Sequence, residues 1–139
     1  ECGLEEARNC FPDVELISFH GDYRSKQAEA VMAAYQGACD AVIGININTT
    51  LGAIRAIEAR KLAVPGDIQV ISCDSAEGED VNGLTTMRVD DQKLGFHAVH
   101  RLLEMIADPA VSPRERLPVS LQLGGSTHPR EVSCVPKCV

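Results

Sequence analysis

Residues 62–74 read LAVPGDIQVISCD, and this stretch decides the fold. The segment 68–73 is apolar at all but two positions, which is the pattern of an interior strand, and it stops on the carboxylate Asp74. A buried carboxylate without a partner costs several kcal/mol or loses its charge. We therefore expect the side chain of Asp74 to meet a partner at the tip of this strand.

The segments before this strand alternate between strand and helix patterns. Apolar residues have the spacing of a strand in 14–19 and 40–46. They have the spacing of a helix in 25–38 and 49–61. Thr49 or Thr50 can cap the second helix. Strands joined by single helices of this length form a parallel sheet with right-handed crossovers. The sequence therefore predicts an α/β lobe with three layers around a parallel sheet.

Beyond Asp74 the pattern is less regular. Residues 75–83 are polar and acidic and indicate a loop, 84–89 indicate a short extended piece, and 117–123 indicate one more strand. The segment 91–108 between them is strongly amphipathic, so a helix here must bury its apolar face against another surface.

Length and composition favour one soluble globular domain. The chain has 139 residues, 45% hydrophobic and 24% charged, and no apolar run approaches the ~20 residues that span a membrane. The net charge of −7 argues against nucleic-acid binding by this chain alone, because such binding depends on clustered Lys and Arg. We expect residues 1–127 to form the domain and 128–139 to form a tail of low structural content.

The cysteines lack the spacing of a zinc site. Cys39 and Cys73 lie in a helix and a strand pattern, where a free thiol behaves as a small apolar side chain. A disulfide among the other four is open but not indicated, and we favour reduced thiols and an intracellular location. These four lie toward the termini: Cys2, Cys10, Cys134 and Cys138.

No motif of a catalytic or metal site is present in the sequence. We find no phosphate-binding glycine loop and no nucleophile elbow. His97 and His100 share a helix pattern but lack a third ligand nearby. The adjacent Asp90 and Asp91 do not face each other as a carboxylate pair would, and a helix cap is the better interpretation of Asp91. We expect no enzyme activity, no metal and no cofactor.

Three residues follow the ends of the predicted strands: Tyr23, Asn46 and Asp74. Ligands of open parallel sheets bind outside the carboxyl ends of the strands, so we expect these side chains to converge. An aromatic ring can cover the C–H surface of a sugar while Asn and Asp hydrogen-bond its hydroxyl groups. Each residue also has a structural interpretation: Asp74 could cap the next loop, Asn46 could support a turn, and Tyr23 could pack on the following helix.

Three segments together resemble the carboxyl-terminal part, mainly the second lobe, of the effector-binding domain of the lactose-repressor/galactose-repressor family of bacterial transcription regulators. They are NTTLGAIRAIEARKLAVPGDIQVISCD at 48–74, LTTMRVD at 84–90 and LPVSLQLGGST at 117–127. The resemblance implies a periplasmic-binding-protein-like (type I) fold, whose two α/β lobes close on a sugar or a purine. It also implies that Asn46 and Asp74 bind ligand hydroxyls and that Tyr23 stacks on the ligand.

The resemblance further implies how such a chain works. We expect a small-molecule sensor in the cytoplasm, without a membrane partner, which contacts operator DNA only through a helix-turn-helix domain absent here. We expect a homodimer that uses the 49–61 helix and the loop after Asp74. The 91–108 helix packs on the first lobe in this family, so we expect it to cause self-association or swapping here. The alternative is a periplasmic sugar-binding protein of a transport or chemotaxis system.

Overall fold

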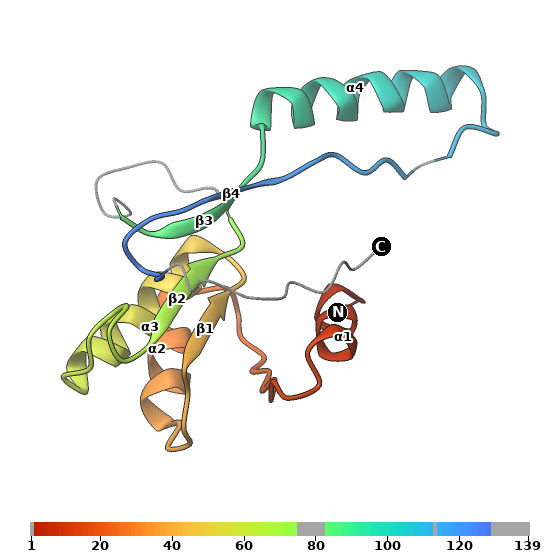
Figure 1. The fold of residues 1–139 in the computed structure, drawn as a ribbon. Coiled ribbons are helices and arrows are strands. Elements are labelled where there is room, and N and C mark those ends of the chain that lie inside the picture. Colours follow the sequence, from red (N-terminus) through yellow and green to blue (C-terminus); the bar gives the residue numbers. More distant parts are fainter. Residues whose placement is uncertain (1, 75–82, 113, 129–139) are drawn as a thin grey trace.

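The computed structural model describes residues 2–74, 83–112 and 114–128, with side chains from residue 6 onward. Figure 1 shows its helices and strands. In chain order they are α1 (Cys2–Cys10), α2 (Ser25–Ala34), β1 (Ala41–Gly44), α3 (Ile47–Ala59), β2 (Gln69–Ser72), β3 (Thr85–Arg88), α4 (Asp91–Ala107) and β4 (Ser120–Gln122).

The strands form one sheet in the order β1-β2-β3-β4. The first three are parallel, and β4 runs antiparallel to β3. Helix α3 lies on β1 and β2, and α2 packs along α3 (Figure 1). Within the described residues, α1 and α4 pack on none of the strands. The predicted α/β class with a mostly parallel sheet is confirmed.

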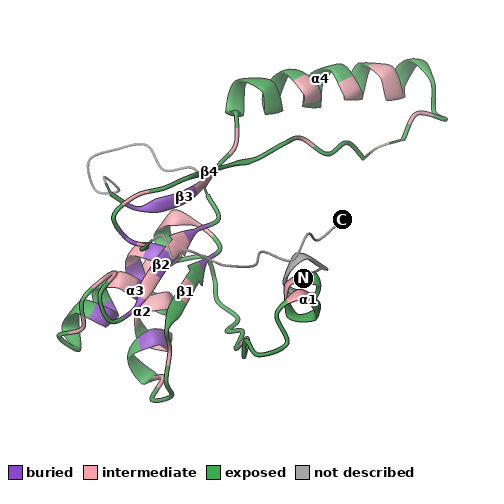
Figure 2. Cartoon of the chain, in the orientation of Figure 1, coloured by how far each residue is buried: buried purple, intermediate pink, exposed green. Residues whose placement is uncertain are grey.

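The apolar core lies between this helix pair and the sheet (Figure 2). Two glycines let α3 lie close to α2 and to β1. A Cβ atom on Gly52 would collide with the carbonyl oxygen of Ser25, and one on Gly44 would collide with the side chain of Thr50. The buried apolar residues are Met32, Ala53, Ala56, Ile57, Ile68, Val70 and Leu84.

The segment after β4 completes the sheet with polar contacts. Ser126 is buried, and its hydroxyl donates to the carbonyl of Val70 at 2.6 Å and accepts from the amide of Thr85 at 2.8 Å. The Val70 amide donates to the Ser126 carbonyl at 2.9 Å. Ser126 therefore joins β2 to β3 where β3 begins.

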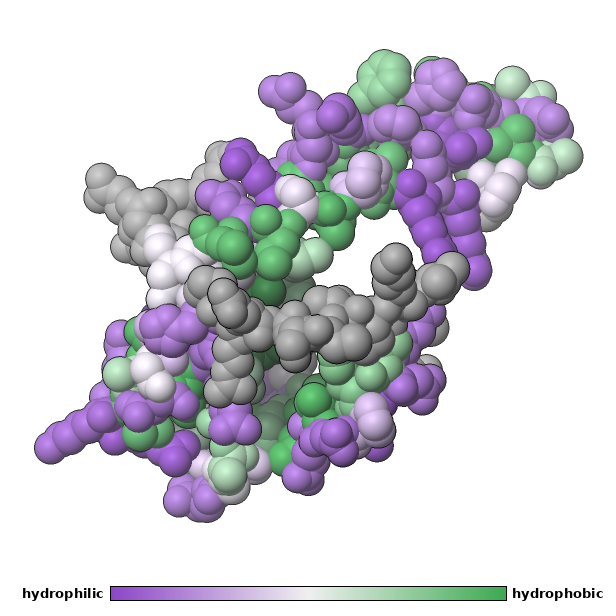
Figure 3. Space-filling view, in the orientation of Figure 1, coloured by the Kyte–Doolittle hydropathy of each residue, from purple (hydrophilic) through white to green (hydrophobic). Residues whose placement is uncertain are grey.

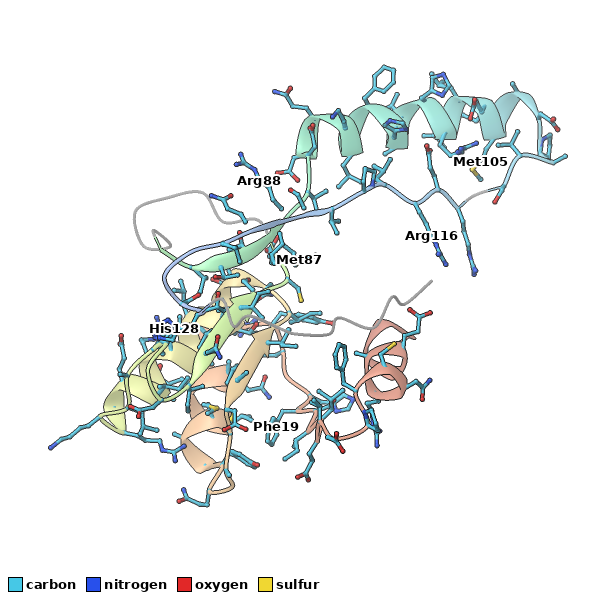
Figure 4. All side chains as sticks on the ribbon, viewed as in Figure 1. Phe19, Met87, Arg88, Met105, Arg116 and His128 are labelled. Carbon is cyan, nitrogen blue, oxygen red and sulfur yellow. The ribbon has the colours of Figure 1, made fainter. Side chains whose placement is uncertain are left out.

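Helix α4 contrasts with the rest of the fold because it contains no buried residue. We call α4 together with the segment 111–119, residue 113 excepted, the arm. Met105 on the helix and Arg116 on the returning segment mark its two sides (Figure 4). Apolar side chains reach the surface over the arm (Figure 3). The most exposed on α4 are Phe96, Val99, Leu102, Leu103 and Ile106.

Ion pairs connect the two sides of the arm. His97 Nδ1 lies 2.9 Å from a carboxylate oxygen of Glu115, and an Arg101 nitrogen lies 3.2 Å from the other. Burial acts to raise the pKa of Glu115, but the hydrogen bonds and charges of His97 and Arg101 lower it overall. The arm is thus held together mainly by polar contacts.

The structure corrects four sequence predictions about elements. Residues 14–19 form no strand, because they make no ladder of hydrogen bonds with the free edge of β1. Helix α2 stops at Ala34, where the next residue takes an extended conformation. Asn46, not Thr49 or Thr50, caps α3, and Asp90, not Asp91, caps α4. Each capping residue, Asn46 or Asp90, has an extended backbone, which lets its side chain accept a hydrogen bond from an amide in the first turn of the helix.

The cysteines divide into thiols and a disulfide. Cys39 packs against the core as expected, whereas Cys73 is exposed at the end of β2, although nearby protein atoms still raise the pKa of its thiol by desolvation. Cys10 is disulfide-bonded, which the sequence did not indicate.

Two further expectations concern the membrane and the tail. Among the described helices, none is both long and apolar enough to cross a membrane. The predicted loop at 75–83 lies outside the described residues except for Gly83, and so does the tail from residue 129 onward.

Candidate ligand-binding site

The carboxyl ends of β1 and β2 bring two of the candidate residues to one edge of the sheet. Gly44 pairs with Ser72 in the parallel ladder, and the Cys73 amide extends the ladder by donating to the Gly44 carbonyl at 2.8 Å. Asn46 and Asp74 each follow two residues after this last pair. Asn46 and Asp74 therefore lie at equivalent positions just beyond the carboxyl ends of neighbouring strands.

Asn46 is engaged in the structure of α3. Its side-chain oxygen accepts from the Thr49 amide at 2.9 Å, and its own amide donates to the Thr49 hydroxyl at 3.2 Å, which completes a capping box. Its side-chain nitrogen donates to the carbonyl oxygen of Tyr23 at 3.4 Å. The turn-supporting role considered from the sequence is thus present, and it places Asn46 next to Tyr23.

Tyr23 presents its side chain to solvent beside this cap. Tyr23 is 63% exposed, and its backbone φ of 64° lies in the left-handed region that favours glycine. Its side chain does not pack on the following helix as an interior residue would. The structure thus brings the Asn46 side chain to the backbone of Tyr23.

Asp74 lies at the adjacent strand tip with an exposed side chain. Its amide donates to the Ser72 hydroxyl at 3.4 Å. Within the described residues its carboxylate has no hydrogen bond or ion pair, and the chain directly after it is not described. Among the described residues, the structure forms no contact between Asp74 and the other two candidate residues.

The side chains at this edge suit a neutral polyhydroxylated ligand. An exposed ring, an amide and a carboxylate combine apolar cover with hydrogen-bond donors and acceptors. The amino-terminal ends of α2 and α3 lie at the same edge, and helix amino-termini carry partial positive charge. Among the described residues, no group of three or more His, Cys, Asp or Glu side chains is placed to hold a metal ion.

Two residues near Tyr23 were missed by the sequence reasoning. Asp22 accepts through Oδ1 from the Arg24 amide at 2.9 Å, and Gln27 accepts through Oε1 from the Asp22 amide. The turn at Gly21-Asp22 was visible in the sequence, and Asp favours such side-chain-to-backbone turns. No sequence pattern indicates that Gln27 reaches back five residues.

A pocket of about 600 Å³ lies where the arm joins the sheet. Arg88, Asp90 and Lys93 contribute charged groups to its wall, together with residues 118–120. The backbone N–H of Lys93, followed by its ammonium group, holds the pKa of Asp90 below its usual range. No motif in the sequence indicates a ligand at this position.

Comparison with known proteins finds a matching family model and similar lactose repressors. The family model described as "Periplasmic binding protein-like domain" matches residues 5–127. The lactose operon repressor of Escherichia coli strain K12 is 39% identical over 83 residues, which are 58% of this chain and 23% of that protein.

The similar solved structures include lac repressor and another LacI family transcriptional regulator. A lac repressor dimer bound to operator and the anti-inducer ONPF matches with a TM-score of 0.79 and 28% identity, over 91% of this chain and 46% of that one. A LacI family transcriptional regulator from Arthrobacter sp. FB24, in complex with lactose, matches with a TM-score of 0.62 and 25% identity, over 76% of this chain and 42% of that one. The chain thus spans less than half the length of these relatives.

Proposed function

This chain belongs to the lactose-repressor/galactose-repressor family through its effector-binding domain, and we propose that it is the sugar-sensing part of a bacterial transcription regulator. The observation that carries this proposal is the placement of Tyr23 and Asn46 together at the carboxyl end of the sheet, with Asp74 at the adjacent strand tip. The activity is binding, not catalysis.

The three side chains would divide the recognition of a sugar among them. The Tyr23 ring covers a C–H face of the sugar, and the Asp74 carboxylate accepts hydrogen bonds from hydroxyl groups. The Asn46 amide has one N–H and one lone pair beyond its two bonds to the protein, so it can bind a hydroxyl while it still caps α3.

Ligand binding would act on DNA indirectly. A ligand that binds one arrangement of two lobes better than another shifts their equilibrium and so changes the affinity of a separate helix-turn-helix domain for operator. We propose accordingly that the protein is cytoplasmic and dimeric, and that operator DNA is bound outside this chain. The similar lac repressor structure is a dimer bound to operator, which supports by analogy both a second copy of the chain and operator DNA as partners.

Calorimetric titration with lactose tests the proposal, using this chain and the full product of its gene. We expect binding that Asp74→Ala abolishes. Asp40→Ala is the matched control, because Asp40 is an exposed carboxylate at the opposite end of β1. Lactose, ribose, galactose and a purine base should be tested in turn, and no response to any of them, or equal affinity in Asp74→Ala, would reject the site.

The alternative function is a periplasmic sugar-binding protein, and the disulfide of Cys10 favours it because disulfides persist in oxidising compartments. The gene upstream of Glu1 separates the two functions. A helix-turn-helix coding region supports the regulator, and a signal peptide supports the periplasmic protein. Alkylation of thiols in freshly lysed cells gives a second test, since a regulator in a reducing cytoplasm would have a labelled Cys10.

A further inference from the structure

The backbone around Tyr23 is held by side chains on both sides. Asn46 donates to the Tyr23 carbonyl at 3.4 Å, and Asp22 accepts from the following amide, that of Arg24, at 2.9 Å. Gln27, on the first turns of α2, accepts from the amide of Asp22. Three side chains from two segments of the chain thus fix three consecutive residues.

The ring of Tyr23 has no comparable support. The side chain is mostly exposed, and among the described residues it forms no pair with another aromatic ring and no hydrogen bond through its hydroxyl. Its backbone also adopts the left-handed conformation that non-glycine residues avoid. The backbone bonds therefore set the direction of the Cα–Cβ bond of Tyr23, while the ring beyond it is mostly exposed.

We infer that Asp22, Gln27 and Asn46 are positioning residues, which hold Tyr23 in its left-handed conformation so that its ring faces the binding site before a ligand arrives. This inference rests on the proposed function of Tyr23 as the stacking residue. A residue whose backbone is already held loses less conformational freedom when a sugar binds, so the same ring contact gives a higher affinity. None of the three residues needs to touch the sugar for this effect.

Asn46 allows its two structural roles to be separated. Its oxygen caps α3, whereas its nitrogen holds Tyr23. Asp is an equally good cap but has no side-chain donor, so Asn46→Asp preserves the start of α3 and removes the bond to Tyr23. Gln27→Ala removes a different bond in the same group and lies outside the proposed ligand contacts.

Hydrogen exchange of the ligand-free chain tests the inference directly. In Gln27→Ala we expect the amides of residues 22–24 to exchange about fivefold faster or more, because local opening becomes easier. Asn46→Asp should act likewise while the amides of α3 stay protected. Gln36→Ala is the matched control, since Gln36 bonds only to Ala33 near the other end of α2. Unchanged exchange at 22–24 in both variants would overturn the inference.

A double-mutant cycle with lactose tests whether Gln27 acts through the ring. We expect Gln27→Ala to weaken lactose binding about threefold to tenfold when Tyr23 is present and not at all in a Tyr23→Ala background. An equal loss in both backgrounds would indicate a general structural role and overturn the inference. If Tyr23→Ala binds lactose normally, or none of lactose, ribose, galactose and a purine base binds to the wild type, the proposed function fails, while the exchange result still decides the positioning role.

Discussion

The molecule contains two regions whose helices are both amphipathic but whose surroundings differ. In the body, which we define as α2, α3 and β1–β3 with their connections, the apolar faces of the helices are buried and form the core (Figure 2). In the arm, α4 has 17 residues and none of them is buried. Amphipathic spacing thus specifies a helix and its apolar side, but only a second apolar surface turns that side into a core.

The largest expected effect tests this difference by truncating one residue in each region. Ile57 in the body is 0% exposed, whereas Leu103 in the arm is 60% exposed. We expect Ile57→Ala to reduce the free energy of unfolding by about 2–5 kcal/mol, because it leaves a cavity. Leu103→Ala should change it by no more than about 0.5 kcal/mol. Urea denaturation followed by circular dichroism measures both, and a loss at Leu103 as large as that at Ile57 would show that the arm is buried in solution.

A smaller effect is expected where the chain after the arm returns to the body. Ser126→Ala removes the acceptor of the Thr85 amide and the donor to Val70, all at buried positions. We expect a loss of about 1–3 kcal/mol in the free energy of unfolding, since a buried amide is left unpaired. Ser120→Ala, at an exposed position of β4, is the control and should be nearly neutral. Equal stability of the two variants would contradict the role of Ser126 as the link between β2 and β3.

The exposed apolar side of the arm is a candidate surface for self-association. The sequence predicted such self-association, and it stays a prediction. We expect sedimentation velocity to show concentration-dependent self-association of this chain, because contiguous apolar surface of this kind favours contacts between proteins. Leu103→Asp should reduce it, whereas Lys26→Asp on the exposed side of α2 should not. A strictly monomeric wild-type chain would count against it.

The smallest effect concerns pH at the start of the arm. The pKa of Asp90 lies below its ordinary value of 3.8 because its carboxylate accepts from the Lys93 amide and pairs with the Lys93 ammonium. A folded-state pKa below the unfolded one stabilises the fold above the unfolded value, and this contribution is lost as pH falls through the folded value. We therefore expect the first turn of α4 to fray below about pH 4.

Amide exchange of residues 93 and 94 between pH 2 and 6, corrected for the intrinsic pH dependence of exchange, measures this fraying. Asp90→Asn keeps a capping acceptor without a titrating charge, so its protection should vary less with pH. The same pH dependence in Asp90→Asn as in the wild type would exclude Asp90 as the titrating group.

The sequence predicted the body well because its elements bury their faces against one another. The strand at 68–73 and the helices before it follow from local spacing, and their partners lie nearby in the chain. The prediction for 14–19 was wrong because a strand also needs a neighbour to share its hydrogen bonds. For the site, the positions of Asn46 and Asp74 at adjacent strand tips could be predicted, whereas the bond from Gln27 to the Asp22 amide could not. It depends on one side chain reaching a backbone group across a turn, which leaves no periodic pattern.

The order in which the chain can fold is a consequence of where the arm is inserted. Thr86 of β3 pairs with Gln122 of β4, so the two strands would form a simple hairpin if the arm did not separate them. The entropy lost on closing such a connection grows only with the logarithm of its length, about 0.6 kcal/mol for each doubling. A large deletion within the arm should therefore barely affect the body's equilibrium. During synthesis, however, Ser126 reaches Val70 only after 56 further residues have been added, so the last hydrogen bonds of the sheet must wait until the whole arm has been made.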